Sequence, residues 1–231
     1  MRTTRAQKVS FTRRLFAWWA RAARDLPWRR TRDPYRVLVS EFMLQQTQVA
    51  RVAEYYPRFL ERFPDLETLA RSRPRAVREA WDGLGYYARA SNLHSLARVV
   101  SRDHGGKLPD VAEELVKLPG VGPYTAGAVA SFAYEKPVPA VDTNVARVLR
   151  RAFGNVERGM RNAELWRLAS MLVPKNGKRA WKFNQAVMEL GALVCVARKP
   201  RCPECPVRPV CRTGKARRTD AAGENRLSKS R

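Results

Sequence analysis

Hydrophobic residues recur along this chain at the three- and four-residue spacing of amphipathic helices, and the two-residue alternation of strands is nearly absent. The segment FTRRLFAWWARAARDL, which begins at Phe11, places its apolar side chains at helical intervals. Asp33 stands before Pro34 and an apolar run, as in a helix that begins with an N-cap and a first-turn proline. Shorter helices are expected to be separated by prolines, namely Pro57, Pro64, Pro74 and Pro109. The pattern predicts an all-α fold.

The 231-residue chain divides only near its end. No Gly/Ser-rich linker and no internal repeat interrupts the helical pattern, so residues 1–211 are expected to form one body. The last stretch, 212–231, holds seven basic residues, two acids and a single leucine, and we expect it to be a disordered basic tail.

The charge balance indicates a polyanionic partner. Lys and Arg number 45 against 21 Asp and Glu, which gives a net charge of +24 and a pI near 11.0. This excess suits nucleic acid or an anionic membrane surface. General solubility and an arginine-rich genome are the alternative explanations, and we favour nucleic acid over both. No apolar run approaches the ~20 residues of a transmembrane helix, and no signal-peptide pattern follows the N-terminus. We therefore expect an intracellular, cytoplasmic, nucleoid-associated protein that binds no membrane.

Residues Leu118–Pro119–Gly120–Val121–Gly122 lie between two helical segments and suggest a helix–hairpin–helix. Glycine permits a tight turn and close approach to a ligand, and the first N–H groups of the following helix can bind a phosphate. An ordinary glycine turn between packed helices is the alternative, and the basic charge of the chain favours contact with a DNA backbone.

All four cysteines fall within a short segment with the spacing C-x6-C-x2-C-x5-C, at Cys195, Cys202, Cys205 and Cys211. A zinc site usually has paired short Cys knuckles, whereas this segment has one short pair and two longer arms. Four thiolates also suit a single [4Fe–4S] cluster, which we favour over zinc. Disulfides are the least favoured possibility. The absence of a secretion signal indicates a reducing compartment, in which disulfides are rare.

Taken together, the hairpin, an aspartate some twenty residues further on and the cysteine spacing resemble the endonuclease III superfamily of DNA glycosylases. Within it, four stretches are most similar to the MutY-type adenine glycosylases: residues 26–49, 83–94, 118–134 and 183–195. The resemblance extends over about residues 10–212. It implies a two-lobed fold with the catalytic cleft between the lobes, in which residues 28–140 form a six-helix lobe with the hairpin, and residues 1–27 and 141–211 form a lobe with the iron–sulfur loop.

Two carboxylates are candidates for cleaving a purine N-glycosidic bond, which requires a proton on the leaving base and stabilisation of a cationic sugar. Glu41 lies in an apolar helical stretch, where burial would keep it protonated. Asp142 lies at a helix start, where the dipole favours its anion. The resemblance implies that Glu41 protonates N7 of adenine and that Asp142 stabilises the sugar cation and the arriving water. A surface glutamate and a simple N-cap aspartate are the alternatives.

Tyr124 lies at the position where bifunctional relatives of the endonuclease III type have a lysine that forms a Schiff base with the sugar. A phenol cannot form that imine, so the resemblance implies a monofunctional glycosylase, although Tyr124 also suits a packing role. The MutY pattern further implies that Gln46 and Tyr86 insert into the base stack. The same pattern implies that an adenine pocket is formed by Trp28, Arg29, Leu44 and Glu189, and that Asn144 supports Asp142. Trp28 and Leu44 also suit a hydrophobic core.

Two departures from the MutY pattern keep alternatives open. We expect a basic tail after Cys211 in place of the C-terminal domain with which MutY-type enzymes recognise 8-oxoguanine. Residues 142–144 are Asp-Thr-Asn, where many such sequences have Asp-Gly-Asn. A thymine/uracil mismatch glycosylase is therefore the main alternative, and a non-catalytic DNA-binding module is a distant one. We expect the partner to be double-stranded DNA containing a mismatch, bound by a monomer.

Overall fold

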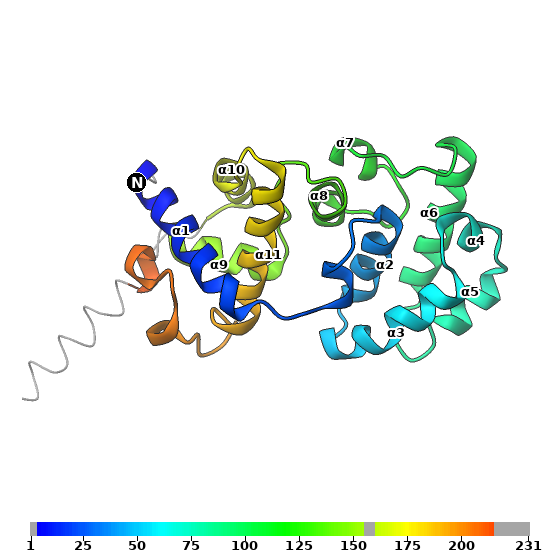
Figure 1. The fold of residues 1–231 in the computed structure, drawn as a ribbon, viewed down its shortest axis with the longest axis horizontal. Helices are drawn as coiled ribbons and strands as arrows, with labels where there is room; N and C mark the ends of the chain where they lie inside the picture. The colour runs from blue at the N-terminus through cyan, green and yellow to red at the C-terminus, as the bar shows by residue number, and fades with distance from the viewer. Residues whose placement is uncertain (1–3, 155–159, 215–231) are drawn as a thin grey trace, which may run out of the picture. The chain divides into compact units, whose positions relative to one another are not determined.

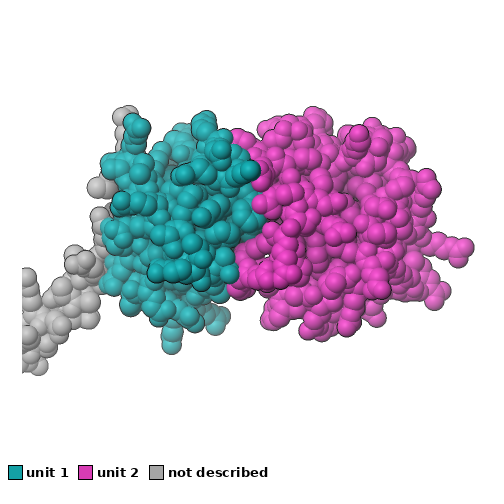
Figure 2. Space-filling view, in the orientation of Figure 1, with its two compact units in different colours: residues 1–23, 141–231 teal, residues 24–140 magenta. Residues whose placement is uncertain are grey.

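In the computed structural model, residues 4–154 and 160–214 are described, and every regular element within these ranges is helical (Figure 1). The all-α prediction is confirmed for this part of the chain. None of the helices in the described ranges combines the length and the apolar character that crossing a membrane requires. The described residues belong to two compact units, one of residues 24–140 and one of residues 1–23 and 141–231 (Figure 2).

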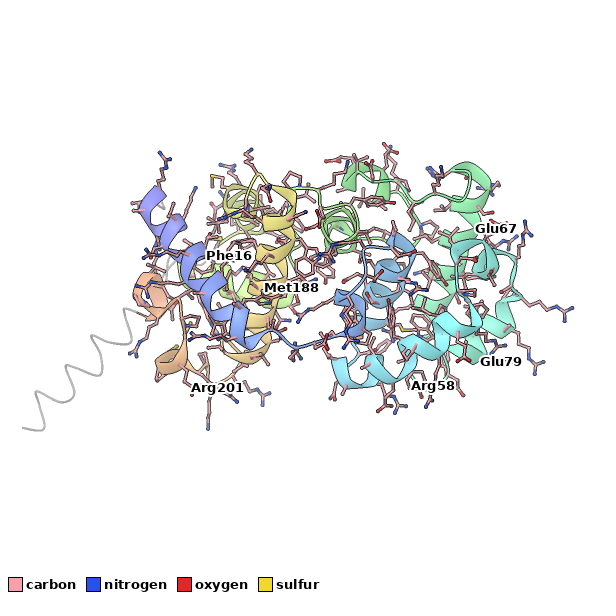
Figure 3. The ribbon with its side chains drawn as sticks, in the orientation of Figure 1. Phe16, Arg58, Glu67, Glu79, Met188 and Arg201 are labelled. Atoms are coloured by element: carbon pink, nitrogen blue, oxygen red, sulfur yellow. The ribbon has the colours of Figure 1, made fainter. Side chains whose placement is uncertain are left out.

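The unit of residues 24–140 holds seven α-helices and one 3₁₀ turn. The resemblance implies six helices, and the additional one is a single turn just before the hairpin. Its elements are a 3₁₀ turn at Pro27–Arg29 followed by α2 (Pro34–Leu44), α3 (Val49–Arg62), α4 (Leu66–Arg71), α5 (Pro74–Ala80), α6 (Ala88–Asp103), α7 (Ala112–Leu115) and α8 (Pro123–Phe132). Phe59 and Trp81 are fully buried and meet edge to face at 5.6 Å. Polar side chains such as Arg58, Glu67 and Glu79 lie on the surface of this unit (Figure 3).

The other unit joins the N-terminal helix to the C-terminal third of the chain. It contains α1 (Arg5–Ala22), α9 (Thr143–Phe153), α10 (Asn162–Leu172), α11 (Gly177–Leu193) and 3₁₀ turns at Cys202–Glu204 and Arg208–Val210. Phe11 and Leu15 of α1 are fully buried in a core with residues of α9, α10 and α11. Phe16 and Met188 pack partly buried against the same core (Figure 3).

One predicted helix start is confirmed by its capping contact, and one predicted helix break is absent. Asp33 Oδ1 accepts the N–H of Arg36 at 2.8 Å, which confirms the predicted N-cap of α2. Pro57, however, does not end a helix but lies inside α3. Val52, Tyr56 and Phe59 bury one face of α3, and this packing stabilises the helix despite the N–H that proline lacks.

Residues 212–214, which the sequence assigns to the basic tail, are held against the helical unit. The Arg212 guanidinium donates to the carbonyl of Phe153, and the Thr213 hydroxyl donates to that of Arg151 at 2.9 Å. These bonds to the end of α9 hold residues 212–214 against the unit, and the rest of the tail lies outside the described residues.

Candidate active site

Glu41 lies on the buried face of α2, where its side chain is only 3% exposed. Tyr124, in the first turn of α8, donates its hydroxyl to Glu41 Oε2 at 2.7 Å. The structure therefore joins two predicted site residues that are 83 positions apart in the chain. A phenol that donates to one carboxyl oxygen stabilises the anion left after the carboxyl gives up a proton.

The hairpin takes its shape from two buried apolar side chains and two exposed glycines. Leu118 and Val121 are 5% and 6% exposed, and the Val121 N–H closes the turn on the Leu118 carbonyl at 3.1 Å. Gly120 has φ +73, a left-handed conformation that favours glycine. Gly122 is the N-cap residue of α8, with nothing within 4 Å of the space that a Cβ would occupy. The hairpin thus presents bare backbone at the start of a helix.

Asp142 is the N-cap of α9, with Oδ1 accepting the Val145 N–H at 2.6 Å. Asn144 donates its side-chain N–H to Asp142 Oδ2 at 2.9 Å, so this predicted pair is in contact. Burial raises the pKa of Asp142, while the Val145 N–H, Asn144 and Arg147 act to lower it. The N–H groups at the helix start favour the anion, but the cost of desolvating the carboxylate is larger, so the pKa is raised overall.

Arg147 continues this chain of contacts. Its guanidinium donates to Asn144 Oδ1 at 2.6 Å, to the Gly191 carbonyl at 2.8 Å and to the Cys195 carbonyl at 2.7 Å. Asn144 is thereby oriented with its amide N–H toward Asp142 and its oxygen toward Arg147. A Cβ on Gly191 would lie 2.6 Å from Cβ of Asn144, so glycine is needed where α11 passes α9.

The remaining predicted DNA-contacting residues are spread over both units. Trp28 is buried and its ring meets that of Tyr56 edge to face at 5.7 Å between centroids, which agrees with the alternative role of Trp28 in the hydrophobic core. Arg29 donates to the Arg24 carbonyl at 2.9 Å, and Leu44 ends α2, half-buried. Gln46 and Tyr86 are exposed, whereas Glu189 is buried on α11.

No disulfide joins the four cysteines, which line one cavity together with apolar side chains such as Val148 and Leu190. Arg151 donates to Cys195 Sγ at 3.4 Å, and the Gly214 N–H donates to Cys211 Sγ at 3.4 Å. Burial raises the pKa of Cys205 to about 11. Four thiols aimed at one cavity, with N–H groups directed at two of the sulfurs, fit a group that binds thiolates.

The four cysteines line the cavity without gathering at one point. Among the described residues, no three His, Cys, Asp or Glu side chains gather closely enough to hold one ion. The cysteines instead surround a shared space, which suits a cluster of several atoms.

Sequence reasoning missed three buried or bridging arginines: Arg89, Arg147 and Arg151. Their signal in the sequence is weak, because one-fifth of this chain is basic and most arginines are exposed. The spacing of Arg147 and Arg151 after Asn144 on one helix, at three and seven residues, is the only local indication.

Comparison with known proteins relates this geometry to DNA repair. The sequence profile of the HhH-GPD superfamily base excision DNA repair proteins matches residues 39–171. The adenine DNA glycosylase of Rattus norvegicus is 44% identical over an alignment of 235 positions, which covers 96% of this chain and 44% of that protein. The adenine DNA glycosylase of Mycobacterium tuberculosis (strain ATCC 25618 / H37Rv) is 47% identical over 195 residues, which are 84% of this chain and 64% of that protein. The chain therefore spans less than two thirds of these relatives' length.

Solved structures show the same fold. A thermostable thymine-DNA glycosylase superposes with a TM-score of 0.85 at 33% identity, over 91% of this chain and 98% of that one. A trapped endonuclease III–DNA covalent intermediate superposes with a TM-score of 0.79 at 26% identity, over 94% of this chain and 99% of that one.

Proposed function

Because the chain belongs to the HhH-GPD superfamily of base excision DNA repair proteins, we propose that it is a monofunctional DNA glycosylase acting on mispaired adenine. It removes adenine opposite guanine or 8-oxoguanine from double-stranded DNA and leaves an abasic site. The observation that carries the choice of adenine is the 44–47% identity to adenine glycosylases over 84–96% of the chain. The thymine-DNA glycosylase is 33% identical, so thymine or uracil opposite guanine is the second candidate.

In the proposed reaction, Glu41 gives a proton to N7 of the extruded adenine, which weakens the bond between N9 and the sugar. The electrons of that bond go to the base, and a cationic sugar remains. The Tyr124 hydroxyl, 2.7 Å from Glu41 Oε2, stabilises the carboxylate that forms. The anion of Asp142 stabilises the sugar cation until water adds to C1′. The proton lost by that water balances the one given by Glu41, so the reaction consumes only water.

Specificity is tested with matched duplexes that differ in one pair. Purified protein is incubated with adenine opposite 8-oxoguanine, adenine opposite guanine, and thymine or uracil opposite guanine, and alkali then cleaves abasic sites. We expect cleavage of the adenine strands, with the fully paired duplex as the control. Cleavage confined to the thymine or uracil strands would overturn the choice of adenine, and activity on none of them would favour a non-catalytic DNA-binding module.

The monofunctional mechanism is tested by borohydride reduction on an abasic duplex. The wild-type protein is expected to give no covalent adduct, because Tyr124 has no amine that can form an imine. The Tyr124→Lys variant, which restores an amine, serves as the matched control. Efficient trapping of the wild-type protein would contradict this mechanism.

The cysteine cavity is proposed to hold one [4Fe–4S] cluster. Cys195, Cys202, Cys205 and Cys211 would be the ligands, and the N–H groups of Arg151 and Gly214 would hydrogen bond to the sulfurs. Bound there, the cluster would stabilise the four thiolates and fix the loop. The expected readout is a broad visible absorbance and about four iron atoms per chain. One zinc atom per chain without that absorbance would contradict the proposal.

The partner proposed for this enzyme is a mismatched duplex bound by a monomer. Two of the structural neighbours are endonuclease III–DNA complexes, which supports binding to DNA. Such a substrate also fits the predicted intracellular, nucleoid-associated location.

A further inference from the structure

Arg89 is a buried arginine that forms no salt bridge with any carboxylate in the described part of the chain. It lies in the first turn of α6 and is only 6% exposed. The ring of Trp81 lies 5.5 Å from its guanidinium carbon and that of Tyr86 lies 5.6 Å from it. Burial lowers the pKa of Arg89. A cation in such a place requires other compensation.

Backbone carbonyl groups from two separate segments provide that compensation. At the end of α2, Nη1 of Arg89 donates to the carbonyls of Phe42 at 3.1 Å, Met43 at 2.7 Å and Gln45. The last carbonyls of a helix have no partner within the helix and carry partial negative charge. Arg89 therefore caps α2.

The same guanidinium binds the loop between α5 and α6. Its Nη2 donates to the carbonyls of Leu84 at 3.1 Å and Gly85 at 2.9 Å, and its Nε donates to that of Tyr86 at 3.4 Å. One side chain thus cross-links the end of α2 to a loop some 40 residues further along the chain.

Both cross-linked segments carry an exposed residue in a left-handed backbone conformation. Gln46 follows the Gln45 carbonyl and has φ 56, and Tyr86 has φ 48. Residues other than glycine rarely adopt such angles, and they keep them where surrounding contacts fix the backbone. Tyr86 is nevertheless 62% exposed, so burial of its side chain does not fix this conformation. The hydrogen bonds of Arg89 to the backbone hold both turns.

A second arginine reinforces the loop from α3. Arg51 donates to the Gly83 carbonyl from Nη2 at 3.0 Å and from Nε at 3.3 Å. Four consecutive carbonyls, those of residues 83–86, therefore accept hydrogen bonds from guanidinium groups. Such a loop is already ordered before any ligand arrives.

We propose that Arg89 is a positioning residue that holds Gln46 and Tyr86 as one preformed pair for insertion into the DNA base stack. This inference rests on the proposed function, in which a base leaves the duplex and the gap must be filled. Preorganisation lowers the entropy lost on binding, so Arg89 acts on base extrusion rather than on attraction to the phosphate backbone.

The test uses Arg89→Lys, which keeps the charge but cannot reach all six carbonyls, together with Arg89→Ala. Arg98→Ala, an exposed arginine on the same helix, is the matched control. Extrusion is followed by the fluorescence of 2-aminopurine next to the mispaired adenine. We expect the rate of fluorescence increase and the single-turnover excision rate to fall roughly ten- to hundredfold in Arg89→Lys. Affinity for undamaged duplex should stay within about twofold of the wild-type value.

A double-mutant cycle separates positioning from general support of the fold. In a Gln46→Ala/Tyr86→Ala background, adding Arg89→Lys should change the extrusion rate little, because the residues it positions are already gone. If the full loss persists in that background, or if folded Arg89→Lys extrudes bases at the wild-type rate, the proposal is overturned. Circular dichroism verifies folding, and Arg89→Lys alone decides if Arg89→Ala does not fold.

Hydrogen exchange in the free protein keeps this inference distinguishable from the proposed function. Arg89→Lys should raise exchange of the amides of residues 45–47 and 84–87 together, whereas Arg98→Ala should not. Wild-type protein that excises no base would refute the proposed function but leave this measurement decisive. Unchanged exchange at both segments would refute the proposal that Arg89 holds them in place.

Discussion

Asp142 shows how two local effects on one carboxyl group compete. The N–H of Val145 and the side chain of Asn144 donate to its oxygens and favour the anion, and Arg147 adds a nearby positive charge. Burial nevertheless raises the pKa of Asp142. An anion whose solvation by water has been replaced by a few fixed donors is well placed to stabilise a cation that forms beside it.

Replacing Asp142 with asparagine should abolish excision and spare binding. Asn keeps an oxygen for the Val145 N–H but carries no charge, so we expect a loss of about a thousandfold or more in the single-turnover rate. Affinity for a mismatched duplex, measured by gel shift, should stay near the wild-type value. Full residual excision by Asp142→Asn would refute the role proposed for this residue.

The wild-type protein and Asp142→Asn also test the raised pKa of Asp142, through the pH dependence of the free energy of unfolding. The folded protein binds the Asp142 proton more tightly than the unfolded chain, so this group stabilises the fold at low pH. That contribution is lost as the pH rises from the ordinary value of 3.8 through the raised folded value. Urea unfolding between about pH 4 and pH 7 should show the wild-type protein losing stability relative to Asp142→Asn over this window. A difference between the two proteins that is independent of pH would contradict the raised pKa.

Tyr124 is proposed to act through its hydroxyl, and Tyr124→Phe removes that group alone. The loss of one hydrogen bond to a carboxylate, about 1.5–3 kcal/mol, should slow excision roughly ten- to hundredfold. Tyr134→Phe is the matched control, because the Tyr134 hydroxyl in the same unit donates to the Leu108 carbonyl. Equal rates for wild-type protein and Tyr124→Phe would assign Tyr124 a packing role.

At the scale of elements, the hairpin before α8 separates two uses of glycine. Gly120 needs its left-handed conformation, and a Cβ there would lie 2.6 Å from Cβ of Asn92. Gly122 has φ −90, an ordinary value, and open space where a Cβ would point. The first glycine therefore serves the turn, and the second leaves room at the start of the helix.

Alanine substitutions at these two glycines should have opposite effects. Gly120→Ala is expected to lower the free energy of unfolding by about 2 kcal/mol, from backbone strain and a close contact. Gly122→Ala should leave stability nearly unchanged but weaken DNA binding by about 1 kcal/mol, roughly fivefold, because the Cβ occupies the space a phosphate needs. Chemical denaturation and DNA titration measure the two effects. Wild-type DNA affinity for Gly122→Ala would argue against backbone contact at this hairpin.

At the scale of the whole molecule, the net charge of +24 predicts an affinity for DNA that depends strongly on salt. If the protein neutralises six to ten phosphates, raising salt from about 50 to 200 mM should weaken binding by about 10³–10⁵. Titrations with mismatched and fully paired duplexes should give similar slopes of log affinity against log salt, because backbone contacts are shared. A slope near zero would show that the positive charge is not used for DNA.

The helices, their caps and the hairpin could be predicted from sequence because they depend on residues close together in the chain. Apolar spacing locates α1, Asp33 with Pro34 starts α2, and Leu118 to Gly122 turns the chain before α8. The cysteine spacing likewise marks one local segment. Pro57 departs from this local pattern, because the packing of α3 outweighs the tendency of proline to end a helix.

Only the tertiary structure decided which of these residues meet and how deeply they are buried. The contact of Tyr124 with Glu41, the six carbonyls around Arg89 and the raised pKa of Asp142 all depend on segments far apart in sequence or on the removal of water. Hydrophobic periodicity fixes which face of a helix is buried, but it carries no information about which distant side chain lies opposite. The sequence therefore determined the elements and the residue types available for chemistry, and long-range packing determined their partners and their burial.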